Sequence, residues 1–220
     1  MKNMIEIKNV TKFFKNEKIF ENLNLVLEEN KIYGFVGRNG SGKSVLFKLI
    51  CGYCLPDKGE ILINGKKIGK EIDFPENLGA LIENPGFMKY ETGFKNLYYL
   101  AKIRNEITNM DIRETMRMVG LDPYLKKHVG KYSLGMRQRL GIAQAIMEKP
   151  RILILDEPMN GLDENGVMLI RKIILQYKKD NRVILLASHN KEDINILCDE
   201  VFELNDGKLV QTINRGVYEQ

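Results

Sequence analysis

The sequence of 220 residues lacks any apolar run close to the roughly 18–20 residues that a membrane-spanning helix needs. Its first residues lead directly into a strand pattern, without the apolar stretch of a secretory signal peptide. We therefore expect a cytoplasmic chain that reaches the inner face of the cell membrane only through a partner.

Cysteine is also scarce, with three residues in the chain. Cys51 and Cys54 form a C-x-x-C pair, but Cys198 is far away in sequence and no second pair has metal-site spacing. This pattern argues against a zinc site. We expect reduced thiols that pack beside the core.

A dedicated basic helix or tail is missing too, although the net charge is +5. Lysines alternate with Asp and Glu along the whole chain, which is typical of a solvated surface rather than a nucleic-acid interface. We therefore expect no nucleic-acid partner. Hydrophobic content of 44% and charged content of 29% fit a soluble globular domain.

The most informative stretch is a glycine-rich turn between a predicted strand at 31–36 and a predicted amphipathic helix at 45–50. Glycines permit the positive φ angles with which backbone N–H groups surround phosphate oxygens, and a helix N-terminus adds partial positive charge. Lys43 is expected to reach the β- and γ-phosphates, and the Ser44 hydroxyl to ligate Mg²⁺. The stretch predicts a nucleoside triphosphate site formed by Gly37, Arg38, Asn39, Gly40, Ser41, Gly42, Lys43, Ser44 and Val45.

The rest of the chain alternates strand and helix patterns except for one helical region. Apolar periodicity favours helices from about Tyr90 to Leu140, with breaks at Gly120 and at Asp122-Pro123. Later helices are predicted at 165–178 and from Lys191. Predicted strands are 4–10, 19–27, 60–63 before an Asn64-Gly65 hairpin turn, 78–82, 151–155, 183–187, and 200–204 before a hairpin through Asp206-Gly207.

Polar groups follow two of the predicted buried strands. Asp156 and Glu157 come after 151–155, and Ser188-His189 comes after 183–187. Ligands of open α/β sheets bind outside the carboxyl ends of the strands. Asp156 is expected to hold Mg²⁺, Glu157 to polarise an attacking water, and His189 to lie near the γ-phosphate. The alternatives are a solvated acidic turn and a structural histidine.

Taken together, these residues resemble the ATP-binding subunit of ATP-binding cassette (ABC) transporters over nearly the whole chain. The run from Tyr132 to Arg139 stands where that family has its Leu-Ser-Gly-Gly-Gln signature, and Asn160-Gly161-Leu162-Asp163 matches its D-loop. Phe14 stands at the family's adenine-stacking aromatic. The resemblance implies an α/β P-loop NTPase core with a mainly parallel sheet, an N-terminal antiparallel β subdomain and an inserted helical subdomain at about 86–140, in a single domain over 1–220.

The same resemblance implies a mechanism. Two chains form a head-to-tail homodimer around two ATP molecules, with Mg²⁺. Ser133 and Gly135 of one chain reach the γ-phosphate on the other, backed by a helix that begins near Met136, and Asp163 lies at the dimer interface. A membrane-spanning permease subunit docks near 83–100.

Two departures from the family pattern concern the site. Leu134 and Met136 replace the usual Gly and Gln of the signature, and Glu83 stands where most members have a Gln that contacts Mg²⁺ and the attacking water. Glu83 is therefore expected to be a catalytic and metal-binding residue. Both departures resemble the exporters of peptide antibiotics in bacitracin and lantibiotic self-protection systems.

Two other functions compete with the transporter ATPase. A soluble ABC-type ATPase acting on ribosomes or DNA usually has two cassettes or a long coiled-coil insertion, and this sequence has neither. A P-loop kinase for a small acceptor leaves the signature and the D-loop unexplained.

Overall fold

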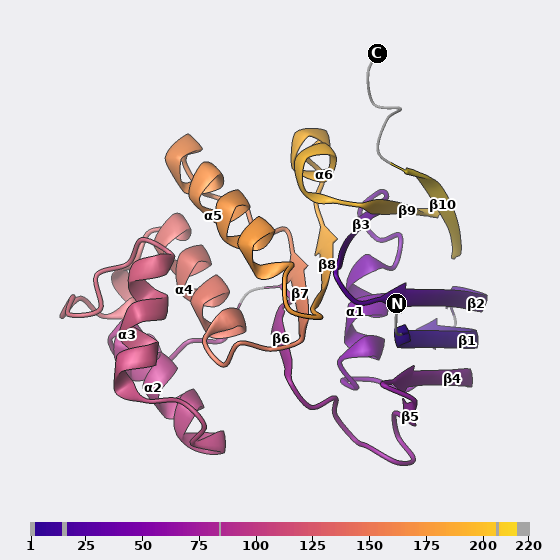
Figure 1. Ribbon diagram of the computed structural model, residues 1–220, viewed down its shortest axis with the longest axis horizontal. Helices are drawn as coiled ribbons and strands as arrows, with labels where there is room; N and C mark the ends of the chain where they lie inside the picture. The colour runs from indigo at the N-terminus through magenta and orange to yellow at the C-terminus, as the bar shows by residue number, and fades with distance from the viewer. Residues whose placement is uncertain (1–2, 15–16, 84, 206, 215–220) are drawn as a thin grey trace.

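The computed structural model describes residues 3–14, 17–83, 85–205 and 207–214, which form two sheets and a group of helices. The helices α2 (Gly93–Arg104), α3 (Asn109–Met118) and α4 (Leu134–Ile146) gather at one end of the molecule (Figure 1). The antiparallel strands β1 (Asn3–Phe14), β2 (Glu17–Glu28) and β4 (Lys58–Ile63) lie at the other end, and α1 (Lys43–Ile50) lies between the two groups. The predicted mainly parallel core, antiparallel β subdomain and helical region are thus all present.

The larger sheet has the strand order β10-β9-β3-β8-β7-β6. All its neighbouring pairs are parallel except β9 and β10. Its strands are β3 (Lys31–Val36), β6 (Leu78–Leu81), β7 (Ile152–Asp156), β8 (Val183–Ala187), β9 (Glu200–Asn205) and β10 (Lys208–Asn214).

Both faces of the sheet are buried at β3, β7 and β8, which explains why these central strands are continuous apolar runs. Because successive side chains of a strand point to opposite faces, the side chains of β8 contribute alternately to two hydrophobic cores. Ile184 and Leu186 pack with the helical side, whereas Val183 and Leu185 pack with α1 (Lys43–Ile50) and the antiparallel sheet.

The antiparallel sheet has the order β2-β1-β4-β5. Its strands are β1 (Asn3–Phe14), β2 (Glu17–Glu28), β4 (Lys58–Ile63) and β5 (Lys66–Lys67). The predicted turn between β4 and β5 is confirmed, since Asn64 and Gly65 have φ angles of 51° and 80°, as a type I′ turn requires. Of the second predicted hairpin turn, Asp206 lies outside the described residues.

The helical region contains α2 (Gly93–Arg104), α3 (Asn109–Met118), the short 3₁₀ helix η1 (Val129–Lys131) and α4 (Leu134–Ile146). The predicted break is confirmed at Gly120, where the φ of 76° ends α3. The predicted end of the helical subdomain, at about residue 140, falls inside α4. The second half of α4 packs on β6 so closely that a Cβ on Gly79 would lie 1.9 Å from the carbonyl oxygen of Ala145.

The start of α4 corrects the prediction of a helix that begins near Met136. Ser133 is its N-cap, and the Ser133 hydroxyl accepts a hydrogen bond from the Met136 N–H at 3.2 Å. The helix therefore begins at Leu134, because the first N–H groups of a helix need such a side-chain acceptor. In the described part of the chain, no helix combines the length and apolar character needed to cross a membrane.

A buried ion pair joins α5 (Glu164–Tyr177) to α6 (Lys191–Leu197) beside the end of β8. Asp193 is 1% exposed and accepts hydrogen bonds from Arg171 at 2.8 Å and 2.6 Å. Its second carboxylate oxygen accepts one from the Ser188 hydroxyl at 3.2 Å. This network fixes the residue that precedes His189.

We expect Arg171→Met to lower the free energy of unfolding by about 3 kcal/mol, because it leaves the Asp193 carboxylate buried without its cation. Urea unfolding measures the change. The matched control is Lys18→Met, which removes an exposed ion pair with Glu21 at 2.6 Å and is expected to change the stability far less, because solvent screens the pair. Equal stability of Arg171→Met and the wild type would contradict the importance of the pair.

Candidate active site

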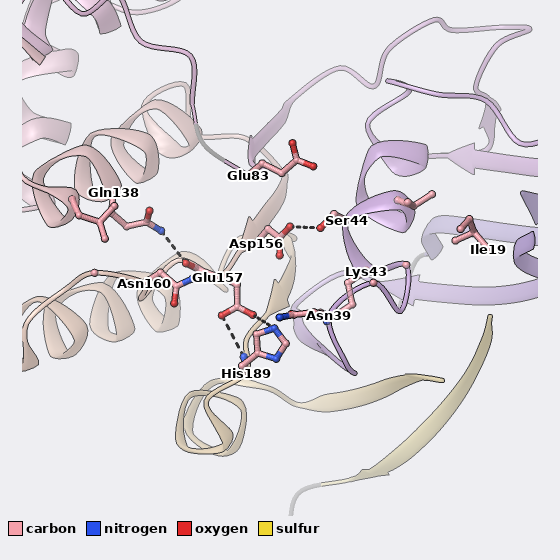
Figure 2. A pocket seen from close by; sticks show the side chains of 15 residues that line it. Ile19, Asn39, Lys43, Ser44, Glu83, Gln138, Asp156, Glu157, Asn160 and His189 are labelled. Atoms are coloured by element: carbon pink, nitrogen blue, oxygen red, sulfur yellow. Dashed lines mark hydrogen bonds and ion pairs between the residues drawn. The ribbon is translucent and has the colours of Figure 1, made fainter. Parts of the chain in front are cut away.

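A cavity of about 600 Å³ opens at the carboxyl ends of β7 and β8, beside the N-terminus of α1 (Figure 2). Elements from both ends of the molecule contribute to its wall, so the cavity lies between the helical region and the antiparallel sheet. The lining residues are Ile19, Asn39, Gly40, Gly42, Lys43, Ser44, Val45, Glu83, Leu134, Gln138, Asp156, Glu157, Asn160, Gly161 and His189.

The glycine-rich turn forms one wall of this cavity. Gly37, Gly40 and Gly42 have φ angles of 146°, 81° and 104°, which side-chain-bearing residues rarely adopt. A Cβ on Gly37 would also lie 2.5 Å from the carbonyl oxygen of Leu204. Gly37 and Arg38 line a neighbouring cavity, and among the described residues the buried Ser41 hydroxyl has no hydrogen-bond partner.

Lys43 is buried at the start of α1, with 7% exposure. Its ammonium donates to the carbonyl oxygens of Gly37 at 2.7 Å and Arg38 at 3.1 Å. Burial lowers the pKa of Lys43, and the carboxylates of Glu157 and Asp156 oppose that shift. A cation at the start of a helix, beside a glycine-rich turn, suits a phosphate ligand.

Ser44 and Asp156 meet across the cavity although 112 residues separate them in sequence. The Ser44 hydroxyl donates to Asp156 Oδ2 at 2.7 Å, from α1 to the end of β7 (Figure 2). A hydroxyl and a carboxylate are ligands that Mg²⁺ takes together with substrate phosphates and water. The two residues therefore fit the metal ion of a Mg²⁺–nucleotide substrate.

Glu157 and His189 form the third part of the site. The backbone N–H of His189 donates to Glu157 Oε2 at 3.3 Å, and its Nε2 lies 3.4 Å from Glu157 Oε1. Burial raises the pKa of Glu157 above its usual value, while the nearby His189 opposes the shift. Glu157 also has a φ of 51°, a strained conformation that is often found at functional sites.

Sequence reasoning gave no role to several residues of the wall. The Gln138 side chain donates to the backbone carbonyl of Glu157 at 2.9 Å, which ties α4 to the end of β7. Gln138 and Asn160 fall inside the two motifs quoted above, so the motifs could have indicated them. No pattern in the sequence indicated Ile19, which lines the cavity from β2.

Besides Gly37, Arg38 and Ser41 of the glycine-rich turn, four predicted site residues lie outside the lining of this cavity. Phe14 is 62% exposed at the end of β1, and Ser133 is an exposed N-cap of α4, followed two residues later by Gly135. Asp163 is the N-cap of α5 and forms an ion pair with Arg139 at 3.1 Å. The roles predicted for these four residues stay predictions.

Glu83 reaches the cavity from the connection between β6 and α2 (Figure 2). Its carboxylate pairs with Lys48 at 2.6 Å. Leu134 also lines the cavity, at the position where the family signature quoted above has glycine. It packs on the D-loop, since a Cβ on Gly161 would lie 2.5 Å from the Leu134 side chain.

The sequence is similar to the sequences of known proteins. An uncharacterized ABC transporter ATP-binding protein of Bacillus subtilis, YybJ, is 43% identical over 99% of both chains. The bacitracin transport ATP-binding protein BcrA of Enterococcus faecalis is 37% identical over 97% of this chain and 70% of its own.

Among solved structures, the ATP-binding cassette MJ0796, determined as a dimer in a post-hydrolysis state with ADP and Pi, has a TM-score of 0.86. The match covers 97% of this chain and all of that one at 22% identity, a likeness that concerns the fold alone. The model of the ABC transporter family matches residues 20–160. The chain thus belongs to the ABC transporter family, in which it corresponds to the ATP-binding subunit.

Proposed function

We propose that the chain is the ATP-hydrolysing subunit of a membrane exporter for antibiotic peptides or similar compounds. The observation that carries the proposal is the meeting of Ser44 with Asp156 at 2.7 Å, beside Glu157 and a glycine-rich phosphate turn. Such a constellation serves phosphoryl transfer by positioning and charge stabilisation.

The substrate in this proposal is MgATP. The backbone of 37–45 surrounds the phosphates, Lys43 neutralises the β- and γ-phosphates, and Ser44 and Asp156 hold the metal ion. Glu157 accepts a hydrogen bond from the water that attacks the γ-phosphorus. His189 keeps Glu157 in place through the two contacts at its carboxylate.

The proposed working unit is a head-to-tail homodimer. In this unit the exposed Ser133 and the N-terminal turn of α4 of one chain contact the γ-phosphate bound to the other chain. Support comes from the similar cassette MJ0796, whose solved structure is a dimer. In this arrangement Asp163 and the D-loop lie near the contact between the chains, and Phe14 stacks on adenine.

The proposed partner is a membrane-spanning permease subunit, which would hold the chain at the inner face of the membrane. The similarity to a bacitracin transport protein supports an antibiotic exporter. Permease docking is proposed near 83–100, where Met88 and Tyr90 are exposed by 48% and 87%. Large exposed apolar side chains that lie close together often mark an interaction site.

The pH dependence of kcat/KM for ATP should reveal the raised pKa of Glu157. The carboxylate form is the active one and exists above its pKa, so activity falls as the pH drops through that value. We expect this fall above pH 4.5, the ordinary value for Glu. Steady-state ATPase assays measure it, with circular dichroism to confirm that the chain stays folded. A fall only below pH 4.5 would contradict the assignment.

Glu157→Gln is expected to bind ATP but to hydrolyse it about 10²–10⁴-fold more slowly, because the amide cannot act as a base. The ATP-bound homodimer should then accumulate, as measured by light scattering at saturating MgATP. Asp180→Asn, which removes an exposed carboxylate outside the cavity, serves as a control with wild-type turnover. A Glu157→Gln chain that stays monomeric would count against the dimer.

Affinity capture of tagged Glu157→Gln from detergent-solubilised cells tests the partner. We expect a multi-span membrane protein to co-purify, because the trapped ATP state keeps the transporter assembled. The ATP-free wild type is the control for nonspecific capture. Recovery of ribosomes or DNA-associated proteins instead would favour the soluble ABC-type ATPase.

A further inference from the structure

Lys48 lies on α1 one turn after Ser44, outside the lining of the cavity. Residues four positions apart in a helix project from the same face. The Lys48 side chain therefore extends from α1 on the side that carries the Ser44 hydroxyl. Its ammonium lies 2.6 Å from Glu83 Oε1.

Glu83 adds a third carboxylate to the cavity, besides those of Asp156 and Glu157. It follows β6 with a φ of 57°, an uncommon backbone angle for a residue with a side chain. The carboxylates that line the cavity are Glu83, Asp156 and Glu157, and Lys43 is the lysine among them. A triphosphate that enters this cavity therefore meets more negatively than positively charged side chains.

We propose that Lys48 is a positioning residue for Glu83 in ATP binding. Its ion pair holds the Glu83 carboxylate against α1 and offsets its charge, so that the MgATP complex, which is negative overall, meets less repulsion from Glu83. The pair joins α1, which carries the phosphate turn, to the connection that leads into the helical region.

The inference rests on the proposed ATP site, but it is tested by equilibrium ATP binding to the isolated chain. The proposed function is tested by hydrolysis, dimerisation and permease capture, so the two can fail separately. Binding is measured by displacement of a fluorescent ATP analogue in the presence of Mg²⁺.

Lys48→Met removes the charge and keeps the length of the side chain. We expect it to raise the Kd for MgATP about fivefold at low salt, because Glu83 is then uncompensated, and to do so less at high salt. Lys48→Arg should stay within twofold of the wild type. In the double variant Lys48→Met with Glu83→Gln, the Kd should lie within twofold of that of Glu83→Gln alone, because no Glu83 charge remains for Lys48 to offset.

The matched control is Lys67→Met, which breaks the ion pair with Glu60 at 2.9 Å, away from the cavity. Its Kd should equal that of the wild type. Wild-type affinity in Lys48→Met would overturn the proposal. So would a double variant that binds about fivefold more weakly than Glu83→Gln alone, since a loss through Glu83 cannot persist once its charge is gone.

Discussion

The site depends on the parallel pairing of β3, β7 and β8. Parallel strands bring their carboxyl ends to one edge, so the glycine-rich turn, the Asp156-Glu157 pair and His189 meet although the chain separates them. The Ser44–Asp156 hydrogen bond at 2.7 Å directly joins the helix that follows β3 to the end of β7. Because both faces of the sheet are buried, a shift in the register of β7 would displace the carboxylates and disturb both cores together.

Much of this arrangement could be predicted because its signals are local. A continuous apolar strand such as Val183–Ala187, a glycine turn and an Asn64-Gly65 hairpin each need only a few consecutive residues. The bounds of the helices in the helical region were harder to predict from the sequence. Its last helix, α4, begins at Leu134 because Ser133 caps it, and its second half, which runs to Ile146, is stabilised by close packing on β6 at Gly79. The second of these causes is a tertiary contact that periodicity does not contain.

The parts of the site that could not be predicted involve contacts between distant elements. Ile19 reaches the cavity through the folding of the antiparallel sheet, and Gln138 through the approach of α4 to β7. The partner of Glu83 is a similar case. The sequence indicates an acidic residue at an unusual place, but only the packing of α1 against the β6–α2 connection brings Lys48 to it.

The hydrogen bond from Gln138 to the Glu157 carbonyl has a mechanical consequence. Glu157 is held on one side by the backbone of His189 and on the other by a side chain of the helical region. With its left-handed backbone, Glu157 has little freedom to adapt locally. A rotation of α4 relative to the sheet would therefore break the hydrogen bond or move the backbone that carries the Glu157 carboxylate. In the proposed dimer, where the start of α4 faces a second nucleotide, binding at one site would thereby influence the position of the Glu157 carboxylate at the other.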